Sequence, residues 1–372
     1  MIDRWRAVRD RWLTSAAFRQ RASSIPGVRW IARRRARAVF DLVAGFVYSQ
    51  VLHACVQLDI FEKIAQHPLS VDALAVATQL SEEACEKLVA AAVSLRLLER
   101  RGGGLVGLGA LGAPLVGNAG LRNLVLHHTL LYADLADPVT LLRGEAGHTR
   151  MADYWPYAST DSPAAVAANA TGQADTYSAL MTSTQTLIAE EVLAAYRFDP
   201  HQCLLDVGGG EGEFLATVAA RHPALRLMLF DLPPVAARAR DRLSALGLAA
   251  RSRADGGDFF NHPLPLGADI ITLVRVMHDH DDTRIMRLLR NIAAALPAGG
   301  TLLIAEPMAD TAGAEPVGDA YFGFYFLAMG RGKARTFQQM STMLVQAGFG
   351  GVKQWPTRMP LQTSVVTAVK LS

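Results

Sequence analysis

The segment Asp206-Val207-Gly208-Gly209-Gly210-Glu211-Gly212 constrains the fold of this 372-residue chain more than any other feature. It begins within a short apolar run and leads into a stretch with the apolar period of a helix. Glycines at 208, 210 and 212 tolerate left-handed backbone and let a ligand approach the main chain closely. The segment therefore predicts a strand, a ligand-binding turn and a helix at the start of an open α/β sheet.

The glycine spacing separates this turn from two better-known nucleotide-binding turns. A dinucleotide fingerprint needs a glycine at position 213, where the chain has Glu213, and a P-loop needs Gly-Lys followed by Ser or Thr. The chain has no such triplet. Asp206, at the end of the strand, supplies a carboxylate suited to an amino group or a bound water. The turn is therefore expected to serve another kind of nucleoside ligand.

Two later segments extend this site. Asp231 follows the apolar run Leu225–Phe230 and is placed to accept hydrogen bonds from two ribose hydroxyls. Asp258 can accept from an adenine amino group, and Phe259 can lie against the base. The three segments in this order predict S-adenosylmethionine (SAM) as the cofactor. The predicted cofactor-binding residues are Asp206, Gly208, Gly210, Asp231, Leu232, Asp258, Phe259 and Arg275.

Strand-like and helix-like segments alternate through the second half of the chain. The predicted strands are Leu204–Val207, Leu225–Phe230, Ala268–Val274 and Thr301–Ala305, and the predicted helices are Phe214–Arg221, Val235–Leu246 and Thr283–Leu296. This alternation predicts an α/β fold with a parallel, doubly wound, Rossmann-like sheet. Two last segments, Val352–Trp355 and Ser364–Val369, are expected to close the sheet as an antiparallel hairpin.

The preceding part of the chain has the pattern of a winged helix. Ser70 is expected to cap a helix over Val71–Gln79, and Ser81 to cap a second helix that ends near Arg100. A glycine-rich stretch, residues 101–108, then predicts a hairpin. This order is typical of DNA-binding domains, but the second helix carries more glutamates than basic residues. We therefore expect a dimerisation or lid module that binds no nucleic acid.

The positive charge of the chain is concentrated at its N-terminus. The net charge is +3, yet residues 1–40 contain eleven arginines and two aspartates, a local +9 that leaves −6 for the rest. Trp5 and Trp12 recur at helical spacing among these arginines, which predicts an amphipathic helix over residues 2–18, ended by Pro26-Gly27. Such a helix fits an anionic membrane surface. It fits equally well an arm on a partner subunit, and a transit peptide or a nucleic-acid contact is a further alternative.

Four segments are expected along the chain. They are a basic amphipathic arm (1–38), the winged-helix-like module (39–118), a helical connector that contributes to the substrate pocket (119–190) and the cofactor-binding domain (191–372). The apolar run Leu42–Leu58 contains four polar residues, so a core helix is predicted there and not a membrane span. No signal peptide is recognised, and three cysteines at no metal-like spacing fit a reducing compartment such as the cytoplasm.

A candidate base follows the predicted strand Ala268–Val274. A neutral imidazole at the position of His278 can take a proton from a hydroxyl as a methyl group leaves sulfur. Glu306, at the end of another strand, is placed to orient that imidazole, and His280 is the competing base. The aspartates within 279–282 are interpreted as a helix-capping loop, with a divalent-metal site as the alternative.

These segments together resemble the caffeic-acid-type class I SAM-dependent O-methyltransferases. The resemblance rests on Leu205–Gly212, Asp231-Leu232-Pro233, Gly257–Phe260, His278-Asp279 and Ala305-Glu306-Pro307, and extends from roughly residue 40 to the C-terminus. It implies a methyltransferase domain, a winged-helix dimerisation domain, a homodimer, and roles for His278 as base and Glu306 as its supporting acid. Two positions depart from the family pattern: Ala334 stands where a second supporting glutamate is common, and His280 where a tryptophan is usual.

Within this family, further segments resemble the carotenoid O-methyltransferases of purple bacteria. These segments are Phe40–Val51, Asp134–Pro138, Trp155-Pro156-Tyr157 and Ala328-Met329-Gly330. The resemblance implies metal-independent methylation of the tertiary C-1 hydroxyl of an acyclic hydroxycarotenoid. The aromatic stretch Tyr321–Met329 favours a pocket for a long apolar ligand, with ordinary core packing as the alternative. The predicted substrate-binding residues are Met181, Tyr325 and Met329.

Together these observations predict a cytoplasmic SAM-dependent O-methyltransferase of carotenoid biosynthesis, with the basic arm as its contact to the photosynthetic membrane. Two other functions are compatible with the sequence. The first is methylation of a phenol or an aromatic polyketide. The second is a winged-helix regulator that senses SAM, against which the acidic second helix counts.

Overall fold

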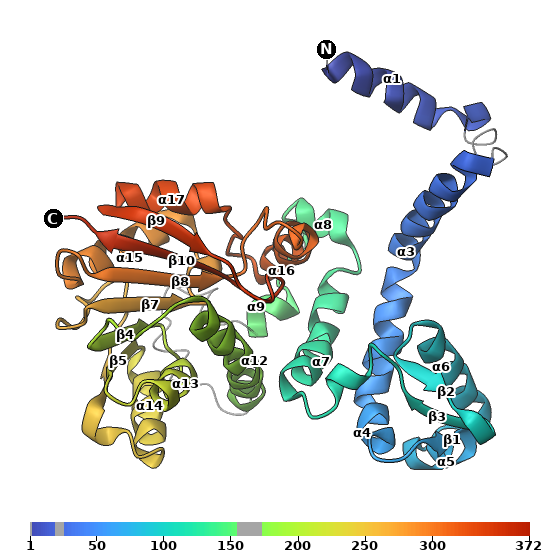
Figure 1. Ribbon diagram of the computed structural model, residues 1–372, viewed down its shortest axis with the longest axis horizontal. Helices are drawn as coiled ribbons and strands as arrows, with labels where there is room; N and C mark the ends of the chain where they lie inside the picture. Colours follow the sequence, from blue (N-terminus) through green and yellow to red (C-terminus); the bar gives the residue numbers. More distant parts are fainter. Residues whose placement is uncertain (1, 19–25, 155–172) are drawn as a thin grey trace. The chain divides into compact units, whose positions relative to one another are not determined.

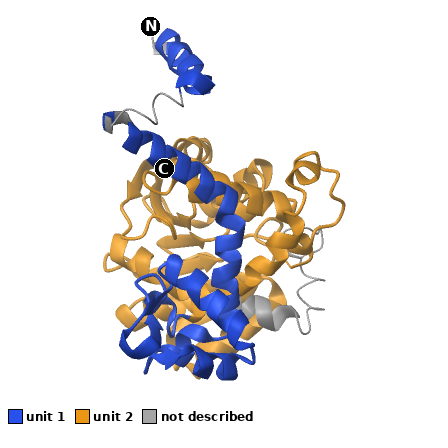
Figure 2. Ribbon diagram, turned by 90° about the vertical axis from the view of Figure 1, so that its right-hand side faces the viewer, with its two compact units in different colours: residues 1–118 blue, residues 119–372 orange. Residues whose placement is uncertain are grey.

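The computed structural model describes residues 2–18, 26–154 and 173–372, and for residues 2, 26, 28 and 173–183 it describes the backbone alone. The chain divides into two compact units, residues 1–118 and residues 119–372 (Figure 2). The second unit contains the predicted cofactor and base residues. It is described first.

The second unit is built on a seven-stranded sheet in the order β6-β5-β4-β7-β8-β10-β9 (Figure 1). Its strands are β4 (Cys203–Val207), β5 (Arg226–Asp231), β6 (Ser252–Gly256), β7 (Ile270–Val274), β8 (Thr301–Glu306), β9 (Phe349–Trp355) and β10 (Ser364–Lys370). The first five in the sheet order run parallel, and β10 is antiparallel to both of its neighbours, β8 and β9. The predicted doubly wound sheet with a closing hairpin is confirmed.

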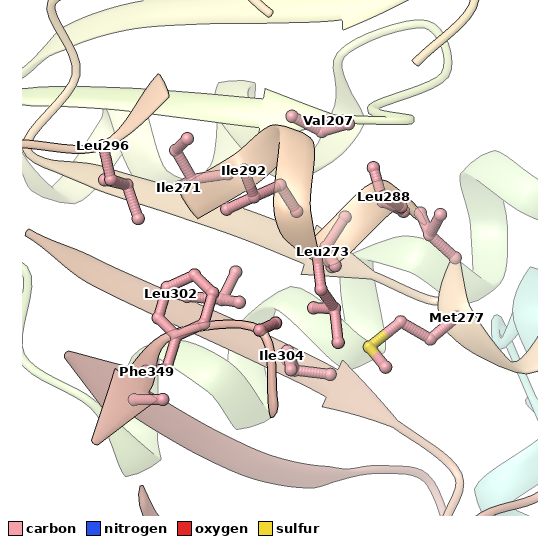
Figure 3. Close-up of a cluster of buried hydrophobic side chains, with 14 of the residues drawn as sticks. Val207, Ile271, Leu273, Met277, Leu288, Ile292, Leu296, Leu302, Ile304 and Phe349 are labelled. Atoms are coloured by element: carbon pink, nitrogen blue, oxygen red, sulfur yellow. The ribbon is translucent and has the colours of Figure 1, made fainter. Parts of the chain in front are cut away.

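Helices cover both faces of this sheet, so its central strands are apolar on both sides. Every residue of β4, β7 and β8 is buried, as expected for parallel strands between two helical layers. One face packs on α15 (Asp282–Ala295) and α17 (Phe337–Gln346), where Ile292, Leu302 and Phe349 belong to one cluster (Figure 3). The other face packs on α12 (Gln173–Ala195), α13 (Glu213–Arg221) and α14 (Pro233–Ala245).

Strand β6 is the one parallel strand that the sequence pattern did not predict. It lies at the edge of the sheet, pairs only with β5 among the described strands, and has one buried residue, Ala254, among its five. Five residues that include Arg253 and Asp255 carry too little apolar signal to be recognised. The strand matters for the site because it delivers Gly257 and Asp258 to the same edge as the glycine turn.

Additional helices of the second unit lie before and after the sheet segments in sequence. They are α7 (Ala119–Asp134), α8 (Pro138–Leu142), α9 (Arg150–Tyr154) and α16 (Phe322–Met329), the last preceded by a π-helical segment, Pro316–Tyr321. Helices α7, α9 and α16 pack together around Leu131, Met151 and Tyr325. Residues 155–157, part of the carotenoid-enzyme resemblance, lie outside the described residues.

The first unit contains the predicted helix–turn–helix and wing. After α4 (Ile60–Ile64) it has α5 (Val71–Thr78), α6 (Glu82–Ser94) and a small sheet of β1 (Leu69–Ser70), β3 (Leu105–Leu108) and β2 (Leu98–Arg100). Ser70 and Ser81 cap the two helices as predicted. The second helix is shorter than expected, because Arg96 is left-handed and Leu98–Arg100 pairs with the wing.

Two predictions about the N-terminal segments are wrong. Helix α1 (Ile2–Thr14) is present, but Pro26 begins the long helix α3 (Pro26–Gln57) instead of ending a helix, because proline is tolerated in a first turn. The run Leu42–Leu58 is not a core helix throughout. Leu42 and Phe46 are 83% and 70% exposed, although Cys55 and Val56 are buried. The exposed strip of Val39, Leu42, Val43 and Phe46 is typical of a surface that an assembly covers.

Among the described residues, helix α3 contains one stretch, Arg29–Gln57, that is long and apolar enough to cross a membrane. The most apolar 18-residue window of this stretch has a mean hydropathy of 1.5, and 11% of that window is buried. By composition, therefore, this region is apolar enough for a membrane span, contrary to the expectation from the sequence. Length and composition alone do not distinguish a span from a helix that is covered by a partner.

Candidate active site

The glycine turn leaves an open cradle at the carboxyl end of β4. Gly208, Gly210 and Gly212 all have positive φ, at 71°, 58° and 83°. A Cβ at Gly208 would lie 2.8 Å from Val276 Cγ2, so only glycine fits there, whereas nothing lies within 4 Å of the same position on Gly210. The turn therefore offers bare backbone and free space to a ligand, as the sequence predicted for a cofactor site.

Asp206 lies beneath this turn and is fully buried. Its Oδ1 accepts a hydrogen bond from Thr272 Oγ1 at 2.7 Å, and its Oδ2 has no partner among the described residues. Burial raises the pKa of Asp206 to about 7, against the hydrogen bond from Thr272. Oδ2 lies only 2.6 Å from the position that a Cβ on residue 209 would take, so the carboxyl group packs directly against the glycine turn.

Asp231, at the end of β5, faces the glycine turn. Its Oδ2 accepts from the Gly210 backbone N–H at 2.8 Å, and its Oδ1 from the Leu232 N–H at 2.7 Å. Burial raises the pKa of Asp231 to about 6, although both N–H groups favour the carboxylate. Each carboxylate oxygen keeps a further lone pair, so the predicted contact to two ribose hydroxyls is chemically available.

Asp258 and Phe259 follow β6 at the same edge. Asp258 Oδ1 accepts from the Phe260 N–H at 2.9 Å, and its Oδ2 accepts from the Asn261 side chain. Phe259 Cε1 lies 3.5 Å from the Cβ position of Gly208, so its ring borders the cradle. The structure thus brings the glycine turn, Asp231, Asp258 and Phe259 together on adjoining strands.

Arg275 completes the predicted cofactor set and has an unusual backbone. It follows β7 with φ of 59°, a left-handed conformation that is uncommon outside glycine. Its backbone N–H donates to Ala305 O at 2.9 Å, and its guanidinium donates to Thr184 Oγ1 at 2.8 Å. Strained backbone of this kind is concentrated at functional sites, because surrounding contacts must hold it.

His278 is buried at the end of β7 and is held by Glu306 at the end of β8. Its Nδ1 contacts Glu306 Oε2, and Glu306 Oε1 accepts from the backbone N–H groups of Val276 and Met277 at 2.9 and 2.7 Å. Glu306 therefore fixes both the ring and the loop that presents it. This is the pair that the sequence predicted, arranged so that Nε2 is the nitrogen left for other partners.

A second carboxylate occupies that other nitrogen. Asp279 Oδ1 lies 3.2 Å from His278 Nε2, a contact that the sequence did not predict. Burial lowers the pKa of His278, but Asp279 and Glu306 outweigh it and raise that pKa to about 10. The two carboxylates therefore favour the protonated form of the imidazole. The capping prediction for this loop is confirmed at Asp281, which accepts from the Arg284 N–H at the start of α15.

His280, the competing base, has a different environment. Its ring lies against Phe260 and Phe259, with centroids at 4.9 and 5.9 Å, and its Nδ1 is buried without a partner among the described residues. Burial lowers the pKa of His280 to about 4. The side chain is thus a neutral ring on the Phe259 side of the site, with no carboxylate holding it as Glu306 holds His278.

The segment Gly332–Thr336 binds the backbone of residues 277–280, here called the histidine loop. The Lys333 N–H donates to His278 O at 2.8 Å, and buried Arg335 donates to Met277 O and His280 O at 2.8 and 2.7 Å. Sequence reasoning did not assign a role to Arg335. Its place directly after Ala334, where the family commonly has a second supporting glutamate, was the available signal.

The predicted substrate-binding residues lie on or near helix α16. Tyr325 is buried and its hydroxyl lies 2.8 Å from His127 Nε2 of α7, while Met329 is buried in the same cluster. Phe326, the residue after Tyr325, packs on the His278 ring, with centroids 5.2 Å apart. The side chain of Met181 lies outside the described residues.

A cavity of about 760 Å³ lies beside α16 and has a mixed lining. Its apolar lining includes Leu141, Leu327 and Met329, and its polar lining includes Asp319, Arg331 and Lys333. Phe326, which also lines it, packs on the His278 ring. Small residues on the opposing segments, such as Ala152, Gly332 and Ala334, leave the space open. The volume is in the range of small-molecule sites. Among the described residues, no group of three or more potential ligands for a metal ion is present.

Comparison with known proteins assigns this architecture to a family. Residues 132–350 match the O-methyltransferase domain, and residues 40–116 match the O-methyltransferase dimerisation domain. The chain belongs to the O-methyltransferase family. The resemblance inferred from the sequence, the fold class and the SAM-dependent O-methyltransferase activity are thereby confirmed, and the dimerisation domain supports a homodimer.

Relatives with named activities cover almost the whole chain. The demethylspheroidene O-methyltransferase of Cereibacter sphaeroides is 43% identical over 96% of this chain and 93% of its own length. The enzyme of the same name from Rhodobacter capsulatus is 40% identical over 97% and 90%. The acetylserotonin O-methyltransferase of Mus musculus is 31% identical over 87% and 86%.

Solved structures agree with the cofactor assignment. Human N-acetylserotonin methyltransferase in complex with SAM is 25% identical with a TM-score of 0.73, covering 91% of this chain and 98% of that chain. The calicheamicin methyltransferase CalO1, solved with S-adenosylhomocysteine bound, has a TM-score of 0.75 at 24% identity and shows the shared fold. The bare glycine backbone, Asp231 and Phe259 in this chain fit such a cofactor.

Proposed function

We propose that this methyltransferase acts on the tertiary C-1 hydroxyl of an acyclic hydroxycarotenoid of the demethylspheroidene or hydroxyneurosporene type. The observation that carries the proposal is the near-full-length similarity to two enzymes named demethylspheroidene O-methyltransferase. The cavity beside Phe326 and Met329 offers space for part of such a substrate, with apolar lining at Leu141, Leu327 and Met329. Because such a substrate resides in a membrane, it would also explain why the chain has an exposed, basic N-terminal arm.

The cofactor is proposed to bind across the carboxyl ends of β4, β5 and β6. Gly208 and Gly210 would lie against it with their backbone, Asp231 and Leu232 would face its ribose, and Asp258 and Phe259 its adenine. Arg275 and Asp206 would hold the surrounding loops. When bound, SAM supplies an electrophilic methyl group on a sulfonium sulfur.

The chain's own task is then to remove the hydroxyl proton at the right place. A tertiary alcohol is a far weaker acid than a phenol, so proton removal has to accompany formation of the new bond to carbon. His278 in its neutral form takes the proton at Nε2, and Glu306 stabilises the resulting imidazolium through Nδ1. Glu306 also accepts hydrogen bonds from the backbone N–H groups of Val276 and Met277, and these bonds fix the loop that carries the His278 ring. No metal ion is assigned to the reaction.

Product analysis tests this function directly. The chain is expressed in a host that makes acyclic hydroxycarotenoids, and the pigments are examined for a methyl ether at C-1. A new methoxycarotenoid that is absent from cells expressing His278→Gln supports the proposal. Purified protein that methylates a phenol panel and leaves the carotenoid unchanged would overturn it in favour of an aromatic substrate, the class suggested by the more distant relatives.

We further propose that the arm, residues 1–38, brings a cytoplasmic enzyme to the surface of the membrane that holds its substrate. On α1, Trp5 and Trp12 are 65% and 60% exposed among arginines. Each basic residue near an anionic surface adds about 1 kcal/mol of attraction. Deleting residues 1–38 should abolish flotation with anionic vesicles and slow turnover of vesicle-held carotenoid. Unchanged flotation, with a loss of dimer in sedimentation, would instead make the arm a subunit contact.

A further inference from the structure

The backbone on both sides of His278 is held by the segment Gly332–Thr336. Met277 O, in the peptide bond before His278, accepts from Arg335 Nη1 at 2.8 Å. His278 O, in the peptide bond after it, accepts from the Lys333 N–H at 2.8 Å. Peptide units are planar, so fixing the two units around a Cα fixes its φ and ψ. These two hydrogen bonds therefore set the direction in which the His278 side chain leaves the main chain.

Arg335 makes the wider of these two connections. Its side chain is 2% exposed, and each of its three nitrogens donates a hydrogen bond. Besides Nη1 on Met277 O, Nη2 donates to His280 O at 2.7 Å, and Nε donates to Asp282 Oδ1 at 2.9 Å. One guanidinium thus joins both ends of the histidine loop to the first residue of α15. The planar fork of arginine permits this, whereas the ammonium of lysine is a single point of donation.

The histidine loop has little internal support of its own. The two turn bonds within it, from the N–H groups of Asp279 and His280, are 3.4 and 3.3 Å long. Typical bonds of this kind measure about 2.7–3.2 Å. Glu306 holds the backbone N–H groups at the start of the loop, and Arg335 holds carbonyls at both of its ends. The loop is therefore fixed mainly from outside, on two opposite sets of backbone groups.

We propose that Arg335 is a positioning residue for methyl transfer, which aims the His278 ring at the substrate hydroxyl without touching the reacting atoms. The inference rests on the proposed role of His278 as the base. Loss of the guanidinium leaves the imidazole chemically intact but removes the support from the carbonyls of its loop. A displacement of about 1 Å in a reacting group can lower the rate by about 100-fold.

The segment that contains Arg335 has two faces. Gly332, Lys333 and Ala334 line the cavity beside α16. The Arg335 guanidinium lies instead against the carbonyls of the histidine loop. A change at Arg335 should therefore alter the rate constant of the bound complex and leave the affinity for the substrate as it is. An arginine with a merely structural role would not produce this split between kcat and KM.

The first test is Arg335→Lys, which keeps the positive charge and loses the planar fork. With hydroxyneurosporene in detergent micelles, kcat should fall by about 10- to 100-fold, while KM and the Kd for SAM stay within about twofold. The assay is run well below the Tm of the variant, so that folded protein is compared. A kcat within about twofold of the wild type would overturn the proposal.

The matched control is an arginine that also binds main-chain carbonyls but lies far from the site. Half-buried Arg251 donates to His222 O, Leu225 O and Ala219 O at 3.1, 2.7 and 2.9 Å, near the amino end of β5. Arg251→Lys should lower the Tm and leave the kcat of the folded protein unchanged. A comparable loss of kcat in both lysine variants would show that general loosening causes the effect, and would contradict the positioning role of Arg335.

Chemical rescue tests the position of the guanidinium itself. Arg335→Ala leaves a guanidinium-sized space among the acceptors Met277 O, His280 O and Asp282. Millimolar guanidinium, too dilute to unfold the protein, should raise the kcat of this variant severalfold and should not raise that of His278→Gln. If folded Arg335→Ala binds SAM but gains no activity from guanidinium, the proposal is wrong.

Failure of the proposed function would look different. Full activity in His278→Gln would refute the proposed base, whereas an unchanged kcat in Arg335→Lys beside an inactive His278→Gln would refute only the role of Arg335. Wild-type protein that leaves the carotenoid unmethylated would refute the substrate. The Arg335 variants are then compared on the phenol that the wild type methylates, because the hold on the histidine loop does not depend on the acceptor. There too, a lower kcat at unchanged KM supports the positioning role, and an unchanged kcat overturns it.

Discussion

The cofactor side and the proton side of this site are built in different ways. On the cofactor side, at the ends of β4, β5 and β6, bare backbone and carboxylates that accept from neighbouring N–H groups form the surface. On the proton side, at the ends of β7 and β8, a buried histidine depends on side chains distant in sequence. Removing a single charge should therefore lower the rate of methyl transfer less on the cofactor side than on the proton side.

The largest effect is expected at the proposed base. His278→Gln removes the proposed proton acceptor but keeps a polar side chain of similar length. Methyl transfer should fall by about 10²- to 10⁴-fold, the usual contribution of a general base, with SAM binding unchanged in calorimetry. If SAM affinity fell as much as the transfer rate, the cofactor side and the proton side of the site would not be independent.

A smaller loss of rate, combined with loss of stability, is expected at Glu306. Glu306→Gln leaves His278 without its buried carboxylate partner and removes a cause of its raised pKa. Breaking a buried pair typically costs about 3–5 kcal/mol, so a lower Tm should accompany a transfer rate reduced by about 10²-fold. An unchanged Tm with an unchanged rate would contradict the role assigned to this pair.

On the cofactor side, Gly208→Ala should act on binding alone. Alanine would adopt φ of 71° under strain, and its Cβ would meet Val276 Cγ2 at 2.8 Å. The free variant is expected to relieve this strain by shifting the turn, and SAM binding then has to restore the turn at a cost of about 1–3 kcal/mol, so the Kd for SAM should rise by at least about fivefold. The maximal rate at saturating SAM should be retained. A lower maximal rate would mean that the turn also positions the base.

The smallest effect is expected at His280. His280→Phe keeps an aromatic ring against Phe259 and Phe260 and removes the competing base. Methyl transfer should stay within about threefold of the wild type, since a conservative change that preserves packing costs little. Abolished transfer with intact SAM binding would move the base from His278 to His280.

The same contrast explains which parts the sequence could predict. The glycine turn, Asp231 and Asp258 were recognisable because each depends on a few consecutive residues after a strand. The strand that delivers Asp258 was missed, since an edge strand with a polar face has little apolar signal. The contact of Asp279 with Nε2 and the hold of Arg335 on the histidine loop follow from tertiary packing, which no local pattern specifies.

Helix α3 shows the same limit in the other unit. Its helical period is plain in the sequence, but whether its apolar face is buried depends on what lies against it. Leu42 and Phe46 are exposed in the single chain, and a dimerisation domain begins at residue 40. Amphipathicity predicts that such a face needs cover, without saying whether the cover is the same chain, a second copy or lipid.

The pH dependence of kcat/KM tests the central claim most directly, because it reports the base of the free enzyme. Neutral imidazole is the active form, so activity should rise with pH on the alkaline side of the ordinary histidine value of about 6.5, toward the raised pKa of His278 of about 10. A profile that is already flat above pH 5, as expected for a base with the lowered pKa of His280, would contradict the account.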